Sequence, residues 1–292
     1  MIAAVGSDLR LEPAPRGAGA ASGDGVLRIS AASSTVPLAE LWEYRELLLF
    51  LAWRDVTVRY KQTSLGVLWA LLQPALMMLI FTLVMGRLAP GAWHGESYAL
   101  FVLCGLVPWQ LVSYALTSSG NSLVSAERLI TKVYFPRLVV PLGSLLAGGV
   151  DFAIAFALLL LAMVVKGIRP GPQIVGLPLA LLLAFLVALA VAILLAALVV
   201  KYRDVRHALS FVAQVWLLAS PIGYPTSFLP EPWRELVVLN PMTGVVEAFR
   251  WALLGQPCPT VAMLVSFVLA AGGLGIGLAY FRRVERTLAD VV

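Results

Sequence analysis

Long apolar stretches separated by short polar segments dominate the chain from residue 65 onward. Several run for about 20 residues without a charge, the length that a helix needs to cross a hydrocarbon layer about 30 Å thick. They are continuously apolar rather than alternating at every second residue, so the pattern predicts helices and excludes a membrane barrel. We therefore expect an all-α polytopic membrane protein with six transmembrane helices, at residues 65–86, 98–116, 138–165, 174–200, 210–229 and 261–281.

The segment ahead of the first span, residues 41–62, is charged yet aromatic. At 100° per residue an apolar stripe forms on one side, with Arg54 and Lys61 on the other. The stripe consists of Leu49, Trp53, Val56 and Tyr60. This pattern predicts an amphipathic helix lying in the membrane surface. A solvated lead-in to the first span is the alternative.

The segment 230–259 is too long and too apolar for a solvated loop, but Pro232, Asn240, Pro241 and Gly244 interrupt it. Two short re-entrant helices on the outer side would account for this pattern. Broken backbone at membrane depth is tolerated only where protein buries it or where it lines an aqueous cavity. The segment is therefore expected at the mouth of a pathway.

Composition supports a membrane protein, because 60% of the residues are hydrophobic and only 13% are charged. Residues 1–40 differ: they are rich in Ala, Gly, Ser and Pro, lack a signal-peptide core, and are expected to form a disordered cytoplasmic tail. Most basic residues flank the predicted spans on the side of the termini, which places both termini in the cytoplasm. The basic residues expected on the outer side are Arg87, Lys166, Arg169, Arg234 and Arg250.

Signals for catalysis or for ligand-binding motifs are weak. The net charge of +5 is explained by orientation and anionic lipid, so no nucleic acid partner is expected. There is no glycine-rich phosphate loop ending in Gly-Lys-Ser or Gly-Lys-Thr. His94 and His207 fall in loops on opposite sides of the membrane, and Cys104 and Cys258 lack metal-ligand spacing. We expect neither an enzyme nor a bound cofactor or metal in this chain.

Asp151 is nearly alone as an ionisable residue inside a predicted span. Carriers coupled to protons or sodium usually hold several such groups, so an externally powered pathway fits better. Asp151 either contacts substrate or a partner helix, or pairs with a polar group inside the bundle.

A series of local motifs, in order along the chain, resembles the permease subunits of type-2 ABC exporters, in the branch that moves O-antigen, teichoic acid and capsule-like polysaccharides. The motifs are Trp53-Arg54-Asp55 through Arg59-Tyr60-Lys61, Leu65-Gly66, Trp69, Gln73-Pro74, Thr131 to Arg137, Lys201 to Val205, Ser220 to Pro225, Asn240-Pro241-Met242 and Phe249-Arg250. Each motif is weak by itself, and their order and spacing carry the resemblance.

The resemblance implies a transmembrane domain over residues 41–292, acting as a homodimer in the bacterial inner membrane with two copies of a separate ATPase that holds ATP and Mg. The substrate would be a lipid-linked polysaccharide. It also implies that the cytoplasmic loop 118–137 carries a coupling helix, with a helix-compatible run at 123–132, that docks on the ATPase. A topogenic basic loop is the alternative. The coupling residues would be Leu129, Lys132, Phe135, Pro136 and Arg137, with Arg54 and Arg59 on the surface helix.

Aromatic side chains suggest a substrate pathway. Trp216, Tyr224 and Phe228 recur at multiples of four in the fifth span, and Trp69 with Phe81 marks a face of the first, beside Gln73. Flat apolar faces let a sugar polymer slide without a fixed register. An interfacial aromatic belt is the alternative. The competing functions are export of drugs or small amphiphiles, an ion-coupled carrier or channel, and a membrane scaffold.

Overall fold

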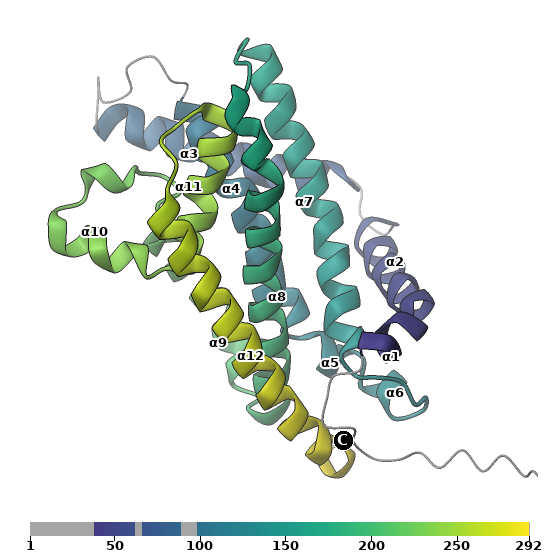
Figure 1. The fold of residues 1–292 in the computed structure, drawn as a ribbon. Helices are drawn as coiled ribbons and strands as arrows, with labels where there is room; N and C mark the ends of the chain where they lie inside the picture. Colours follow the sequence, from purple (N-terminus) through teal and green to yellow (C-terminus); the bar gives the residue numbers. More distant parts are fainter. Residues whose placement is uncertain (1–37, 62–65, 89–97, 292) are drawn as a thin grey trace, which may run out of the picture. The chain divides into compact units, whose positions relative to one another are not determined.

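The computed structural model describes residues 38–61, 66–88 and 98–291, and every regular element in these ranges is a helix (Figure 1). The predicted tail, residues 1–40, lies outside the described residues except at its end, where α1 (Leu38–Glu43) begins. The helix α2 (Arg45–Lys61) follows and corresponds to the predicted surface helix at 41–62. The all-helical fold class is therefore confirmed for the described part of the chain.

Within the described residues, four helical segments are long and apolar enough to cross a membrane. They are Tyr98–Ser119, formed by α4 (Tyr98–Tyr114) and the π-helix η1 (Ala115–Ser119); α7 (Val139–Val165); Pro172–Lys201, formed by η2 (Pro172–Gly176) and α8 (Leu177–Lys201); and the Thr260–Glu285 part of α12 (Thr260–Val291). These four coincide with the second, third, fourth and sixth predicted spans. The first span corresponds to α3 (Leu68–Leu88), whose apolar part, Leu68–Val84, is shorter.

The predicted fifth span, at 210–229, is wrong in its boundaries. The helix α9 (Val205–Ala219) begins earlier and ends well before residue 229. Ser220 is extended, as is favoured for a residue that precedes proline, here Pro221. The chain then turns and forms only the short 3-10 helix η3 (Thr226–Phe228). The residues after Ala219 remain apolar, which is why the sequence predicted a longer helix, but the prolines at 221 and 225 end it.

The helix α4 lies at the centre of the packing. Most of its side chains are buried, and it contacts α3, α7, α8 and the outer helix α11 (Pro241–Leu254). The helices α8 and α12 form the most extensive pair and run side by side in Figure 1. Buried alanines on α8 and Gly277 on α12 allow this approach, since a Cβ at Gly277 would already lie 3.3 Å from the backbone of Leu194. Small residues thus set the helix spacing.

The loop predicted on the cytoplasmic side, 118–137, and the segment predicted on the outer side, 230–259, each contain two helices. The helix-compatible run at 123–132 is broken into two single turns, α5 (Ser122–Ser125) and α6 (Glu127–Ile130). The outer segment forms α10 (Glu231–Val238) and α11, which confirms two helices there. Asn240 caps α11 by accepting a hydrogen bond from the Met242 backbone, and Gly255 ends it in the left-handed region at φ 73°.

A pair of glycine substitutions tests the contact between α11 and α12. A methyl group at Gly244 would lie 2.3 Å from the Ala262 carbonyl oxygen, whereas one at Gly272 meets nothing within 4 Å. Gly244→Ala should lower the apparent melting temperature, because overpacking against backbone costs about 1–3 kcal/mol. Gly272→Ala should raise it slightly, because alanine is favoured over glycine in a helix by about 1 kcal/mol. Thermal scanning fluorimetry of the purified protein measures both, and equal shifts would contradict this packing.

Candidate functional site

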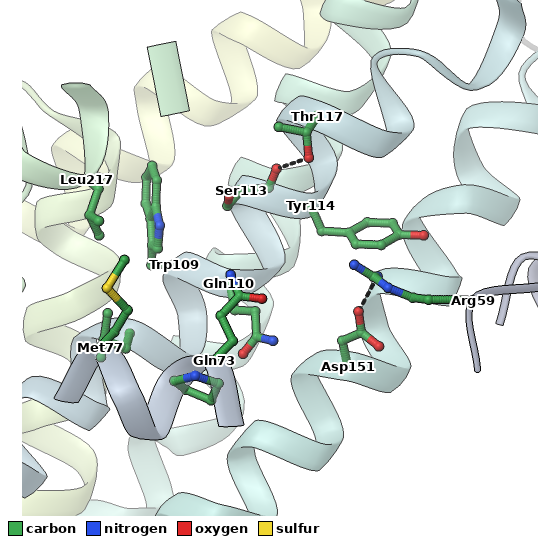
Figure 2. A pocket seen from close by; sticks show the side chains of 12 residues that line it. Arg59, Gln73, Met77, Trp109, Gln110, Ser113, Tyr114, Thr117, Asp151 and Leu217 are labelled. Carbon is green, nitrogen blue, oxygen red and sulfur yellow. Dashed lines mark hydrogen bonds and ion pairs between the residues drawn. The ribbon is translucent and has the colours of Figure 1, made fainter. Parts of the chain in front are cut away.

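The carboxylate of Asp151 lies near the middle of α7 and is 3% exposed. A buried, ionised carboxylate is costly unless it is paired and hydrogen-bonded. Both of its partners come from the end of α2, about 90 residues earlier in the chain. Arg59 Nη1 donates to Oδ2, and the Tyr60 hydroxyl donates to Oδ1 (Figure 2 shows the Arg59 contact). Of the two possibilities for Asp151, the structure therefore shows pairing within the bundle.

The approach of α2 to α7 depends on a glycine. A Cβ at Gly143 would lie 3.1 Å from Leu51 Cβ and 3.3 Å from the Leu48 carbonyl oxygen. Leu51 and Ala52 are buried in this contact, while Leu49 and Trp53 of the predicted stripe are exposed. From there α2 continues along α7 until its last turn reaches Asp151. The surface helix is thus also a packing element of the bundle.

An aromatic ring completes the Arg59 environment. The Arg59 guanidinium carbon lies 4.8 Å from the centre of the Tyr114 ring, which is cation–π distance. Gly148 makes room for this ring, since a Cβ there would lie 2.5 Å from Tyr114 Cδ1. Burial, followed by the hydrogen bond to Asp151, raises the pKa of Tyr60 far above its ordinary value. Its hydroxyl therefore keeps its proton and acts as a donor at any physiological pH.

The ion pair forms one wall of a polar pocket of about 130 Å³ (Figure 2). In the view, Gln73 of α3 and Gln110 of α4 lie between the ion pair and an apolar side. Ser113 and Thr117 add hydroxyl groups, and Met77, Trp109 and Leu217 form the apolar side. A second cavity of about 250 Å³ shares Arg59, Gln73, Gln110 and Asp151 and includes Trp69. No group of three His, Cys, Asp or Glu that could hold a metal ion occurs among the described residues.

The structure brings two of the predicted pathway residues, Trp69 and Gln73, together in these cavities. Trp216 lies next to the first cavity, because its ring contacts Trp109 at 5.8 Å between centroids while its Nε1 donates to Asn240 at 2.8 Å. Phe81 lies against Gly223 instead. The expectation that Trp216, Tyr224 and Phe228 share a helical face is wrong, since α9 ends at Ala219.

The predicted coupling residues divide into exposed and buried ones. Lys132 is exposed, as are the neighbouring Val133 and Tyr134. Phe135 is buried, and Arg137 donates to the Glu285 backbone oxygen of α12 at 2.9 Å. Leu129 and Pro136 are half-buried. Of the two arginines on α2, Arg54 pairs with the adjacent Asp55 at 2.9 Å, whereas Arg59 faces the pocket.

Arg250, which was expected on the outer side of the membrane, is buried on α11, with 1% exposure. It donates to the Ile222 backbone oxygen at 2.8 Å and to that of Phe101 at 3.3 Å, and its guanidinium stacks 3.4 Å from the Phe101 ring centre. These contacts tie α11 to the start of α4 and to the turn after α9.

Sequence reasoning missed the polar row on α4 and η1. Gln110, Ser113, Thr117 and Asn121 follow one another at intervals of three and four, which places them on one side of a helix. This row could have been found in the sequence, because its four polar residues lie within or directly after a strongly apolar span. The row contains a π-helix, a rare form that often marks functional sites.

Comparison with known proteins gives consistent matches. The model of the family "ABC-2 type transporter" matches residues 46–254, from α2 to the end of α11, and so includes every residue of both cavities. The O-antigen export system permease protein RfbA of Myxococcus xanthus is 32% identical over 217 residues, 72% of this chain and 81% of the relative. RfbA of Klebsiella pneumoniae is 26% identical over 256 residues, 85% and 95% of the two chains. The polysialic acid transport protein KpsM of Escherichia coli is 27% identical over 243 residues, 80% and 92%.

Substitutions in the ion pair should have unequal effects on stability. Arg59→Met leaves the carboxylate of Asp151 buried with the Tyr60 hydroxyl as its donor and without a positive charge, which should cost about 3 kcal/mol. Asp151→Asn should cost less, about 1–2 kcal/mol, because the Arg59 side chain is 46% exposed and can turn to water. Arg54→Met is the matched control, because an exposed pair contributes less than about 1 kcal/mol. Apparent melting temperatures should rank in this order, and equal losses at Arg59 and Arg54 would count against a stabilising pair.

Proposed function

The chain belongs to the ABC-2 type transporter family, and from this premise we propose that it is the membrane-spanning permease subunit of an ATP-driven exporter of lipid-linked polysaccharide. The observation that carries the proposal is the nearly full-length similarity to relatives that are named as O-antigen export permeases. The polar pocket supports it, since it combines hydroxyl, amide and indole groups at the level of the middle of α7.

The proposed partners follow from the lack of a phosphate-binding loop and from an exposed loop tip that could dock on another protein. The chain contains no phosphate-binding loop, so a separate ATPase subunit would bind ATP and Mg and power the transport. The exposed tip of the cytoplasmic loop, Lys132 to Tyr134, offers one charge and two large side chains for docking. Two copies of the permease with two ATPases would form the exporter, because cavities of about 130 and 250 Å³ within one bundle do not enclose a polymer pathway.

The same proposal sets the topology. The shorter apolar helices α3 and α9 would supply the first and fifth of six crossings of the inner membrane. The excess of basic residues beside α2, α5, α6 and the end of α12 supports cytoplasmic termini. The helices α10 and α11 would then enter the outer leaflet without crossing it.

The function is tested by deleting the gene in its own host. Loss of surface polysaccharide, with lipid-linked glycan accumulating inside and recovery on complementation, is the expected result. Unchanged surface polysaccharide with increased sensitivity to drugs would instead support export of small amphiphiles. Copurification should also recover an ATPase subunit in equal amount, since an ion-coupled carrier or channel needs none.

The exposed tip gives a specific coupling prediction. Lys132→Glu combined with Tyr134→Ala should reduce export at least about tenfold, because loss of a charged contact and a large anchor typically costs more than about 1.4 kcal/mol at an interface. The amount of protein in the membrane should not change, since Tyr134 is 68% exposed and contributes little to packing. Lys166→Glu, an exposed lysine at the other end of α7, is the control and should export normally. Normal export by the double variant would remove this tip from the coupling surface.

A further inference from the structure

Two members of the polar row carry buried acceptors, Gln110 on α4 and Asn121 between η1 and α5. Among the described side chains, Gln110 Oε1 and Asn121 Oδ1 are buried oxygens without a hydrogen-bond partner. Asn121 is oriented by its own Nδ2, which donates to the Thr117 carbonyl oxygen at 2.6 Å. A buried acceptor without a donor costs free energy, so native proteins seldom retain one without a reason. Gln110 lines both cavities, and its oxygen therefore requires a donor from whatever occupies them.

The charges of the cavities disfavour an anion. The described residues with a formal charge that line either cavity are Arg59 and Asp151, and they already pair with each other. A phosphate would meet the Asp151 carboxylate and the Gln110 oxygen, both of which are acceptors, and would have to displace Asp151 from Arg59. Phosphate sites instead collect donors and unneutralised positive charge. The cavities therefore favour a neutral ligand that carries its own donors.

Hydroxyl groups on a ring meet both requirements. A hydroxyl can donate to Gln110 Oε1 or to Asp151 and accept from the guanidinium of Arg59, which is 46% exposed at its side chain. Ser113 and Thr117 can bond to further hydroxyls, and the indoles of Trp69 and Trp109 provide apolar walls for the C–H face of a ring. Acceptors, donors and aromatic walls thus surround two cavities that share Arg59, Gln73, Gln110 and Asp151.

We propose that this pocket is a subsite for one neutral sugar ring, and that it excludes the phosphate of a lipid carrier. The proposal rests on the proposed function and deepens it by naming the part of a lipid-linked glycan that the permease recognises between α2, α3, α4 and α7. Of the polar row, Gln110, Ser113 and Thr117 line the first cavity and offer the ring hydrogen-bonding groups there.

The test uses the permease with its ATPase in lipid nanodiscs and carries the substitution Ser113→Cys. Labelling of the new thiol by a small methanethiosulfonate reagent is followed by peptide mass spectrometry. Native Cys258 is exposed and lines neither cavity, so it reports the general labelling rate, whereas Cys104 is buried. The probes are dodecyl maltoside and dodecyl phosphate, which share a tail and differ in carrying a neutral sugar or an anionic head.

Dodecyl maltoside should slow labelling at position 113 by at least about threefold relative to Cys258, and dodecyl phosphate should not. Adding Gln110→Leu should raise the half-protecting maltoside concentration about fivefold, the effect of one hydrogen bond. The companion change Gln110→Glu keeps an acceptor oxygen and should retain protection. Protection by the phosphate, equal protection by both probes, or none by either would overturn the sugar subsite.

These outcomes are separate from those of the proposed function. If deletion abolishes surface polysaccharide but maltoside does not protect position 113, the exporter stands and the subsite is wrong. If deletion leaves surface polysaccharide intact, the proposed function fails whatever the labelling shows.

Discussion

The carboxylate of Asp151 is buried in an apolar helix, and the cost of an unpaired charge there constrains the elements around it. Its pairing with Arg59 and Tyr60 requires α2 to lie against α7 rather than to float in the membrane surface. That position in turn requires a glycine at 143, where the two backbones meet, and a glycine at 148, where the Tyr114 ring fits beneath Arg59. One buried charge is therefore a reason for α2 to pack against the bundle.

Much of the fold follows from the hydropathy of the sequence and from residues that interrupt helices. Continuous apolar runs located the four long spans, and the interruption at Asn240 and Pro241 coincides with the start of α11. The end of α9 was missed because residues after Ala219 remain apolar, so that a window average outweighed the prolines at 221 and 225. Local backbone restriction decided the outcome there, as proline steps generally do.

The site was harder to predict, because its parts meet only in three dimensions. Asp151 was conspicuous in the sequence, but no local pattern links it to residues about 90 positions earlier. The resemblance implied an ATPase contact for Arg59, whereas in the structure its guanidinium pairs with Asp151, where α2 packs against α7. By contrast, the polar row could have been found from its helical spacing alone. Periodicity reveals faces of single helices, whereas contacts between helices depend on which small residues let them approach.

The positions of these elements suggest how a cytoplasmic event reaches the pocket. The loop that carries the exposed tip leads through buried Phe135 directly into α7, and Arg137 fixes its end to α12. A rigid displacement of the loop would therefore move α7 and the carboxylate that α2 holds. Asp151 both pairs with Arg59 of α2 and lines the cavities. A movement of Asp151 would therefore change the contact with α2 and the lining of the cavities together. A displacement of the loop would thus alter the hydrogen bonding in the pocket and the contact of α2 with α7 together.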